Sequence, residues 1–137
     1  MKKIIYTLYS SLIITSCSSS YHNINERGPS ALGGGFQDRE VETGMHFIIA
    51  KTNFKPWVGF DGAYKTFNRR AAELCSEESY KVLEQEEASY PHAYSQGELD
   101  YTISQVSGYV LCTSSPINDI KAKEIIVSDS KNFWFTD

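Results

Sequence analysis

The chain has 137 residues, with 17 acidic residues against 13 Lys and Arg residues and a formal net charge of −4. This length suits one domain with a single hydrophobic core. A negative chain is repelled by nucleic acid, so we expect no nucleic-acid partner.

The first sixteen residues are typical of a secretory signal. Two lysines precede a mainly apolar run over 4–14, which is too short to cross a membrane as a helix. Residues 14–17, Ile-Thr-Ser-Cys, resemble the lipobox of bacterial lipoproteins. The resemblance implies cleavage after Ser16 and acylation of the Cys17 thiol, which makes the membrane a partner through a covalent lipid. The alternative is an ordinary secretory signal with a coincidental cysteine.

The residues after Cys17 predict a location and a linker. In enteric-type bacteria a residue other than Asp after the lipidated cysteine resembles the outer-membrane sorting pattern, and Ser18 is such a residue. We therefore expect a periplasm-facing protein of the outer membrane, with the inner membrane as the alternative. Residues 17–35 are expected to form the lipidated cysteine and a flexible tether, because 18–35 are rich in Ser, Asn and Gly. Residues 36–137 are expected to form a single domain.

The periodicity of apolar residues predicts the elements of that domain. Alternation over 41–52 predicts a strand. Helical spacing over 59–78 predicts one long helix, with Leu74 buried on its apolar stripe. Further strands are predicted over 80–87, 101–113 and 123–127, with 133–135 as an extension of the sheet. The predicted fold is α+β, a mostly antiparallel sheet of about four strands with one long helix packed on a face.

A long loop predicted over 89–100 holds the best candidates for partner binding. It contains Pro91 and Gly97, and tyrosines lie within and beside it. Tyrosine is enriched in the cores of protein interfaces, and loops of this length are often functional. The candidate residues are Tyr90, His92, Tyr94 and Tyr101. The alternative is that these side chains only cover the edge of the sheet.

The cysteines predict one disulfide. If Cys17 carries lipid, Cys75 and Cys112 remain, and only one pairing is possible. Cys75 lies on the helix stripe and Cys112 on a strand, and the periplasm permits disulfides. The alternative is two buried free thiols. A catalytic thiol is disfavoured because neither cysteine has a His or a basic residue next to it in the sequence.

No pattern selects a catalytic or metal site. The three histidines are scattered without the spacing of a zinc motif, and the acidic residues form no calcium-binding loop. We therefore expect no metal, no cofactor besides the lipid on Cys17, and no enzymatic activity.

Two stretches resemble a family of small uncharacterised bacterial outer-membrane lipoproteins. Residues 34–38, Gly-Gly-Phe-Gln-Asp, are similar to a Gly-Gly-Tyr-Ser-Asp/Glu opening, although Phe36 and Gln37 depart from it. Residues 70–74, Arg-Ala-Ala-Glu-Leu, match an Arg-Ala-Ala-Glu run within a helix. The resemblance implies a location and a fold but no reaction. At the level of architecture alone, the chain is also similar to the outer-membrane lipoprotein that senses envelope stress for the Rcs phosphorelay.

These observations together favour a lipid-anchored protein of the cell envelope. Its expected role is non-enzymatic, as a binding, assembly or sensing module with an envelope protein as partner. One alternative is a protein that binds a small ligand or a peptidoglycan fragment. Another is a hydrolase whose site the sequence does not reveal.

Overall fold

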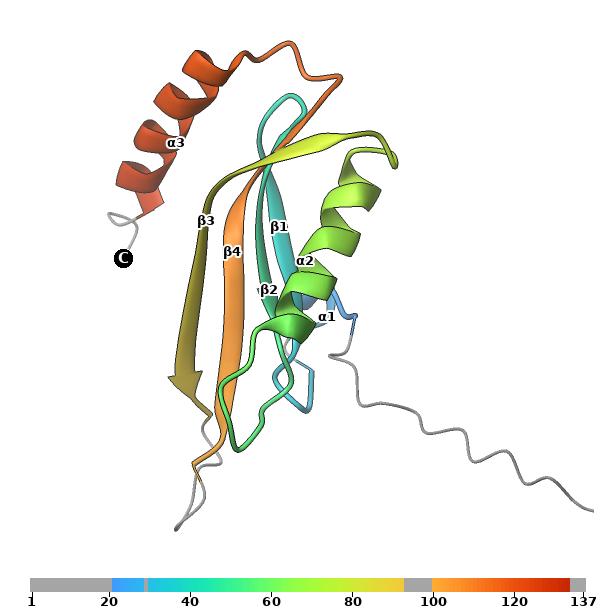
Figure 1. The fold of residues 1–137 in the computed structure, drawn as a ribbon, viewed down its shortest axis with the longest axis vertical. Helices are drawn as coiled ribbons and strands as arrows, with labels where there is room; N and C mark the ends of the chain where they lie inside the picture. Colours follow the sequence, from blue (N-terminus) through green and yellow to red (C-terminus); the bar gives the residue numbers. More distant parts are fainter. Residues whose placement is uncertain (1–20, 29, 93–99, 134–137) are drawn as a thin grey trace, which may run out of the picture.

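The chain folds around one antiparallel sheet with the strand order β1-β2-β4-β3 (Figure 1). A computed structural model describes residues 21–28, 30–92 and 100–133. Helix α2 packs against one face of the sheet, so the predicted α+β fold is confirmed. Among the described residues, no helix is long and apolar enough to cross a membrane. The elements are, in chain order, α1 Ile24–Arg27, β1 Gly35–Glu42, β2 Met45–Lys51, α2 Asp61–Leu74, β3 Tyr80–Pro91, β4 Thr102–Cys112 and α3 Asp119–Phe133.

The predicted strand over 41–52 is divided by a turn. Thr43 and Gly44 connect β1 to β2, and Gly44 has a φ of 74°, which residues with a side chain rarely adopt. β1 begins at Gly35 and was missed because its residues are mostly polar and charged. An edge strand of this composition gives little apolar alternation to detect.

The predicted strand over 123–127 is wrong, because these residues lie within α3. The Asn118 side chain accepts a hydrogen bond from the Lys121 backbone N–H at 2.8 Å and caps the helix. Ala122 and Ile126, four residues apart, are buried in one cluster. Capping and helical spacing therefore outweigh the strand preference of the Ile-Ile-Val run at 125–127. The described part of the chain therefore contains two long helices, α2 and α3, where one was predicted. Phe133 ends α3 instead of extending the sheet, and 134–135 lie outside the described residues.

The two faces of the sheet carry separate cores. Under α2, Phe67 and Ala71 pack with Ile48 and Val110. Leu74 was expected to be buried, but it is only half-buried because it is the last residue of α2, at the margin of this cluster. On the opposite face, α3 covers a smaller cluster made of Met45, Tyr109, Leu111, Ala122 and Ile126.

Within the segment expected to be a flexible tether, residues 21–28 pack against β1. The Tyr21 ring packs on Phe36 with centroids 4.7 Å apart, and Ile24 of α1 is buried. Asn23 forms a parallel bridge with Phe36. The polar composition of 18–35 suggested a linker, but Tyr21 and Ile24 supply the apolar contacts that hold 21–28 against β1. Only 18–20 separate Cys17 from this packed segment.

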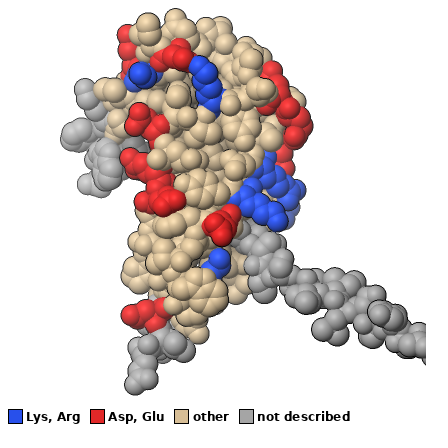
Figure 2. All heavy atoms as spheres, viewed as in Figure 1, with Lys and Arg blue, Asp and Glu red and all other residues tan. Residues whose placement is uncertain are grey.

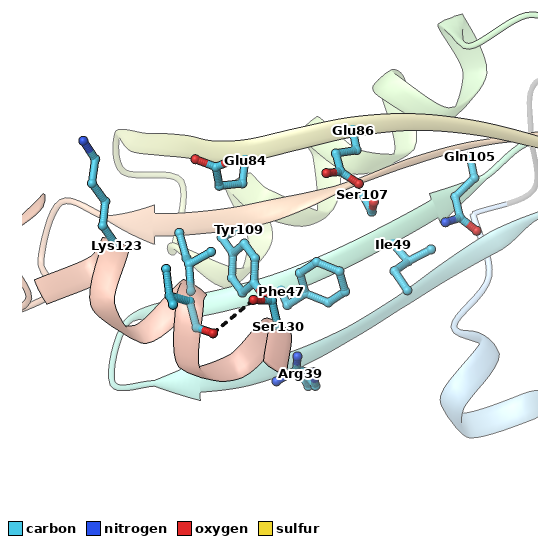
Figure 3. A pocket seen from close by; sticks show the side chains of 12 residues that line it. Arg39, Phe47, Ile49, Glu84, Glu86, Gln105, Ser107, Tyr109, Lys123 and Ser130 are labelled. Atoms are coloured by element: carbon cyan, nitrogen blue, oxygen red, sulfur yellow. Dashed lines mark hydrogen bonds between the residues drawn. The ribbon is translucent and has the colours of Figure 1, made fainter. Parts of the chain in front are cut away.

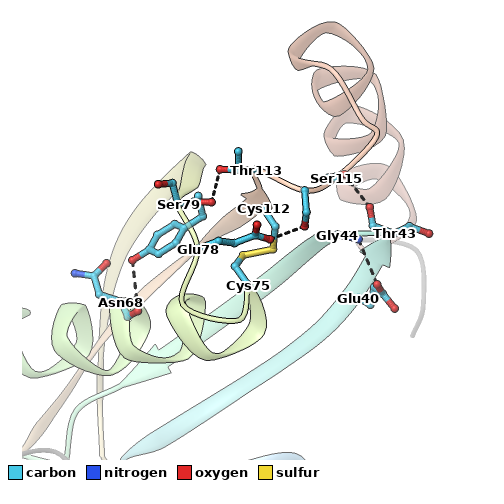
Figure 4. The surroundings of a disulfide bond; sticks show 12 residues. Glu40, Thr43, Gly44, Asn68, Cys75, Glu78, Ser79, Cys112, Thr113 and Ser115 are labelled. Carbon is cyan, nitrogen blue, oxygen red and sulfur yellow. Dashed lines mark hydrogen bonds between the residues drawn. A yellow bond between two sulfur atoms is a disulfide. The ribbon is translucent and has the colours of Figure 1, made fainter.

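Cys75 and Cys112 form the predicted disulfide, with Cα atoms 5.3 Å apart (Figure 4). Cys75 follows α2, and Cys112 ends β4. The Cys112 backbone N–H donates to the Gly44 carbonyl at 2.9 Å, so the bridge lies beside the β1–β2 turn. It fastens α2 to the sheet at the end opposite the β3–β4 connection.

Candidate functional site

A groove of about 700 Å³ lies between α3 and the sheet face that α2 leaves uncovered (Figure 3). We call it the α3 groove. Phe47, Ile49 and Tyr109 form its floor on β2 and β4, and Ile126 and Val127 line it from α3. The groove is therefore a mainly apolar concavity open to solvent.

The strand register explains why this floor exists. Phe47 lies opposite Tyr109, and Ile49 lies opposite Ser107, so these side chains share one face of the sheet. α3 packs on Met45 and Leu111, at one end of that face. Ile49 lies farther along β2 and stays half-buried. Because α3 covers only one end of this face, the apolar floor around Ile49 is available to a ligand.

The helical wall is held to the sheet by a charged network. Two guanidinium nitrogens of Arg39 donate to the two carboxylate oxygens of Asp129 at 2.8 and 2.5 Å. The Tyr109 hydroxyl donates to Asp129 at 2.7 Å, and the Arg39 guanidinium lies 5.2 Å from the centroid of the Phe47 ring. This network fixes α3 over β1 and β4.

The network also shifts the ionisation of its members. Hydrogen bonds from Arg39 hold the pKa of Asp129 below its ordinary value. Burial, followed by the hydrogen bond to Asp129, raises the pKa of Tyr109 above its ordinary value. Proton transfer at neutral pH is best served by groups that titrate near pH 7. The pKa values of Asp129 and Tyr109 are shifted away from that range, which favours a role for both in positioning α3.

The opposite edge of the groove is acidic because β3 contains a bulge. The register shifts between Leu83 and Glu86, so Glu84 and Gln85 together face Gly108. Glu84 has a φ of 46°, and a Cβ at Gly108 would lie 3.2 Å from the Gln85 Cα. The extra residue turns both Glu84 and Glu86 toward the groove (Figure 3). The sequence indicated an acidic, solvated stretch here, but it did not reveal what that stretch borders.

Of the aromatic residues predicted to bind a partner, Tyr90, His92 and Tyr101 are described and lie at the end of the sheet near the β3–β4 connection. β3 continues to Pro91, so Tyr90 belongs to a strand rather than to a loop. It pairs with Ile103, two residues along β4 from Gln105 of the groove. Tyr90 therefore lies on the face of the sheet that carries the groove, beyond its lining residues.

His92 and Tyr101 are brought together by a residue the sequence did not single out. Both rings pack on Phe54, with centroid distances of 4.7 and 5.2 Å. The His92 backbone N–H also donates to the Tyr101 carbonyl at 2.8 Å. These contacts make the pair part of the packing at this end of the sheet. Tyr94 and Cys17 lie outside the described residues.

The two stretches that carry the family resemblance contact each other. Arg70, in the helix run, forms two hydrogen bonds with Asp38 of the glycine-rich opening at 2.7 and 3.2 Å. Its guanidinium also lies 4.9 Å from the centroid of the Phe36 ring. The Tyr21 hydroxyl donates to Glu73 of the same helix run. The stretches therefore fasten β1 and the N-terminal segment to α2, on the face of the sheet opposite the α3 groove.

The sequence did not identify the α3 groove. Phe47 and Ile49 stood out as one face of an alternating strand, but the helix beside them was expected to be a strand. In the ranges 21–28, 30–92 and 100–133, no group of three or more His, Cys, Asp or Glu residues is arranged to hold a metal ion. Comparisons of the chain with known protein families, with curated proteins and with solved structures find no match.

Proposed function

We propose that this protein is a lipid-anchored, non-enzymatic module of the bacterial cell envelope that binds a segment of another envelope protein in the α3 groove. The observation that carries the proposal is an open apolar floor bordered by Glu84 and Glu86 on β3, with Lys123 on the α3 side. A partner segment with apolar side chains would cover Phe47 and Ile49, and a neighbouring Lys or Arg would meet Glu84 or Glu86.

The anchor in this proposal rests on the sequence. The lipobox-like residues 14–17 end at Cys17, and Ser18 favours the outer membrane. The resemblance to small outer-membrane lipoproteins points to the same location. An anchored module acts at a fixed surface, where a binding groove gains effective concentration for partners in the same membrane or nearby.

Site-specific photocrosslinking in intact cells tests the groove. A photoreactive residue in place of Ile49 should capture a protein. The same residue in place of Ile120, which is 74% exposed on α3, should not give that product. Capture should fall in a Glu84→Lys, Glu86→Lys background and persist with Glu42→Lys, which changes an exposed acid outside the groove. Equal capture from both positions, or capture that ignores the groove charges, would refute the proposed site.

A small envelope ligand or a peptidoglycan fragment is the second candidate. The volume of the groove, about 700 Å³, is within the usual range for small-molecule sites. Native mass spectrometry of the chain extracted from envelopes would detect a bound small molecule. A molecule retained by the wild type and lost with Ile49→Asp would favour this candidate over a protein segment.

A further inference from the structure

We propose that the end of the domain formed by Leu32, Trp57 and Val58 lies on the lipid surface to which Cys17 is anchored. We call these three residues the apolar tip. The inference rests on the lipid anchor of the proposed function and adds the orientation of the domain on the membrane.

Two neighbouring loops form the apolar tip. The Phe54 backbone N–H donates to the Leu32 carbonyl at 2.9 Å, which joins the loop before β1 to the loop after β2. Leu32, Trp57 and Val58 are 48%, 63% and 53% exposed. Large apolar side chains exposed on adjoining loops are typical of surfaces that contact a partner or a membrane.

The loop that carries Trp57 is braced against β4. Lys55 exchanges two backbone hydrogen bonds with Thr102, at 3.0 and 2.7 Å. The Gly59 backbone N–H donates to the Ser104 hydroxyl at 3.0 Å. Trp57 is therefore presented by a loop fixed on both sides, which lowers the entropy cost of docking.

The composition of this end favours a lipid surface as its occupant. Residues 30–35 and 51–60 contain Lys51 and Lys55 but no acid, in a chain with 17 acids. In the view of Figure 2 the lower end is mainly uncharged apart from an acidic group at its lower left edge, and most acidic side chains lie farther up. Asp61 directly follows the second of these loops, and Asp100 lies in the β3–β4 connection at the same end of the sheet. Trp lies favourably at the headgroup level of a bilayer, and Lys can extend its amine to water or to anionic headgroups.

Tyr21 lies near this end, a short length of chain from the proposed anchor. Tyr21 packs on Phe36, the second residue of β1, which pairs with Ala50 near the end of β2. The loops of the apolar tip continue from these strand ends. The four residue steps from Cys17 to Tyr21 span at most about 14 Å. An acylated Cys17 therefore holds this end of the domain close to the bilayer.

This orientation keeps the α3 groove accessible. Phe36 pairs with Ala50, which lies in the cluster under α2, whereas Phe47 and Ile49 face the other way. The anchored segment thus lies on the α2 face, and the groove lies on the opposite face. The apolar tip and the groove can be occupied at the same time.

Fluorescence of the full acylated chain in vesicles tests the contact. The vesicles contain phosphatidylethanolamine and phosphatidylglycerol, with or without brominated acyl chains. Trp134→Phe leaves Trp57 as the one tryptophan. Its emission should shift to the blue and be quenched by the brominated lipid. The matched control combines Ile120→Trp with Trp57→Phe and Trp134→Phe, and its emission should resist the brominated lipid.

Each outcome of this experiment is decisive. Quenching of Trp57 beyond that of the control supports the contact. Acylated protein whose Trp57 resists brominated lipid and is quenched by acrylamide as strongly as the control would overturn the contact and leave the anchor intact. Mass spectrometry that finds no acyl group on the N-terminal residue would overturn the anchor, and the inference with it.

Discussion

Arg39, Asp129 and Tyr109 connect three elements that are distant in the sequence. Asp129 accepts hydrogen bonds from both partners, and its side chain is 16% exposed, against 40% for Arg39. Pairs in this half-buried position stabilise more than exposed pairs, because solvent screens them less. At this scale the network determines whether α3 stays over the sheet and therefore whether the groove has a second wall.

Replacing Asp129 by Asn should destabilise the protein by about 1–2 kcal/mol at pH 7, because charge-assisted hydrogen bonds to Arg39 and Tyr109 are lost. The loss is no larger because Arg39 is partly exposed and water can solvate its charge. The folded-state pKa of Asp129 lies below its unfolded value. Its stabilising contribution is therefore present above the unfolded value of about 3.9 and is lost as the pH falls through the folded pKa. Chemical denaturation should show the difference between wild type and Asp129→Asn shrinking below about pH 4.

Asp119 provides the matched control on the same helix. Its pair with Lys81 is 61% exposed on both sides, so Asp119→Asn should change stability by less than about 0.5 kcal/mol. If the two variants lost equal stability at pH 7, the Arg39–Asp129 network would not be what holds α3.

The two long helices use the sheet differently. α2 runs along one face with Phe67 and Ala71 fully buried. The disulfide joins Cys75, the residue after α2, to the end of β4. α3 buries Ala122 and Ile126, whereas Ile120 and Val127 stay exposed. At the scale of elements, α2 supplies most of the core and α3 shapes the groove. Substitutions on α2 should therefore affect stability first, and substitutions on α3 should affect binding.

The burial pattern of α2 gives a graded prediction. Phe67→Ala should cost about 3–5 kcal/mol, because it empties a fully buried site. Leu74→Ala should cost less because Leu74 is half-buried, and Lys65→Ala should stay within about 0.5 kcal/mol. Thermal or denaturant unfolding would rank the three variants. A larger loss for Leu74→Ala than for Phe67→Ala would contradict the described packing.

At the scale of the whole molecule, short-range patterns predicted the sheet and α2 but not the groove. The alternation in β2, the stripe of α2 and the Cys75–Cys112 pairing are each visible in the sequence. β1 has few apolar residues besides Phe36 and adds charged pairs such as Arg70–Asp38 to its backbone pairing with β2, and the start of α3 is capped by Asn118. The groove forms where β2, β3, β4 and α3 come together in the fold, and no residue spacing in the sequence indicates that these elements are neighbours.

The disulfide acts on this same scale, because it closes a loop that contains β3 and β4. With a sequence separation of 37, its removal should destabilise the fold by about 3–4 kcal/mol through the added entropy of the unfolded chain. Urea unfolding of the Cys75→Ala, Cys112→Ala variant would measure this loss. Reductant should shift the wild-type midpoint and leave the variant unchanged. A wild type insensitive to reductant would show that the bridge is dispensable.

The bulge of β3 has a consequence for crowded surfaces. On the proposed lipid anchor, copies of the domain would diffuse in two dimensions at high local density, where exposed strand edges can pair and nucleate aggregates. Residues 84–87, Glu-Gln-Glu-Glu, lie on the β3 edge, and the bulge breaks the regular ladder there. At the β1 edge, the backbone N–H of Phe36 already donates to the His22 carbonyl. At the β3 edge, negative charge and the bulge disfavour pairing with the sheet of a neighbouring copy. At the β1 edge, the segment that contains His22 already occupies part of the strand.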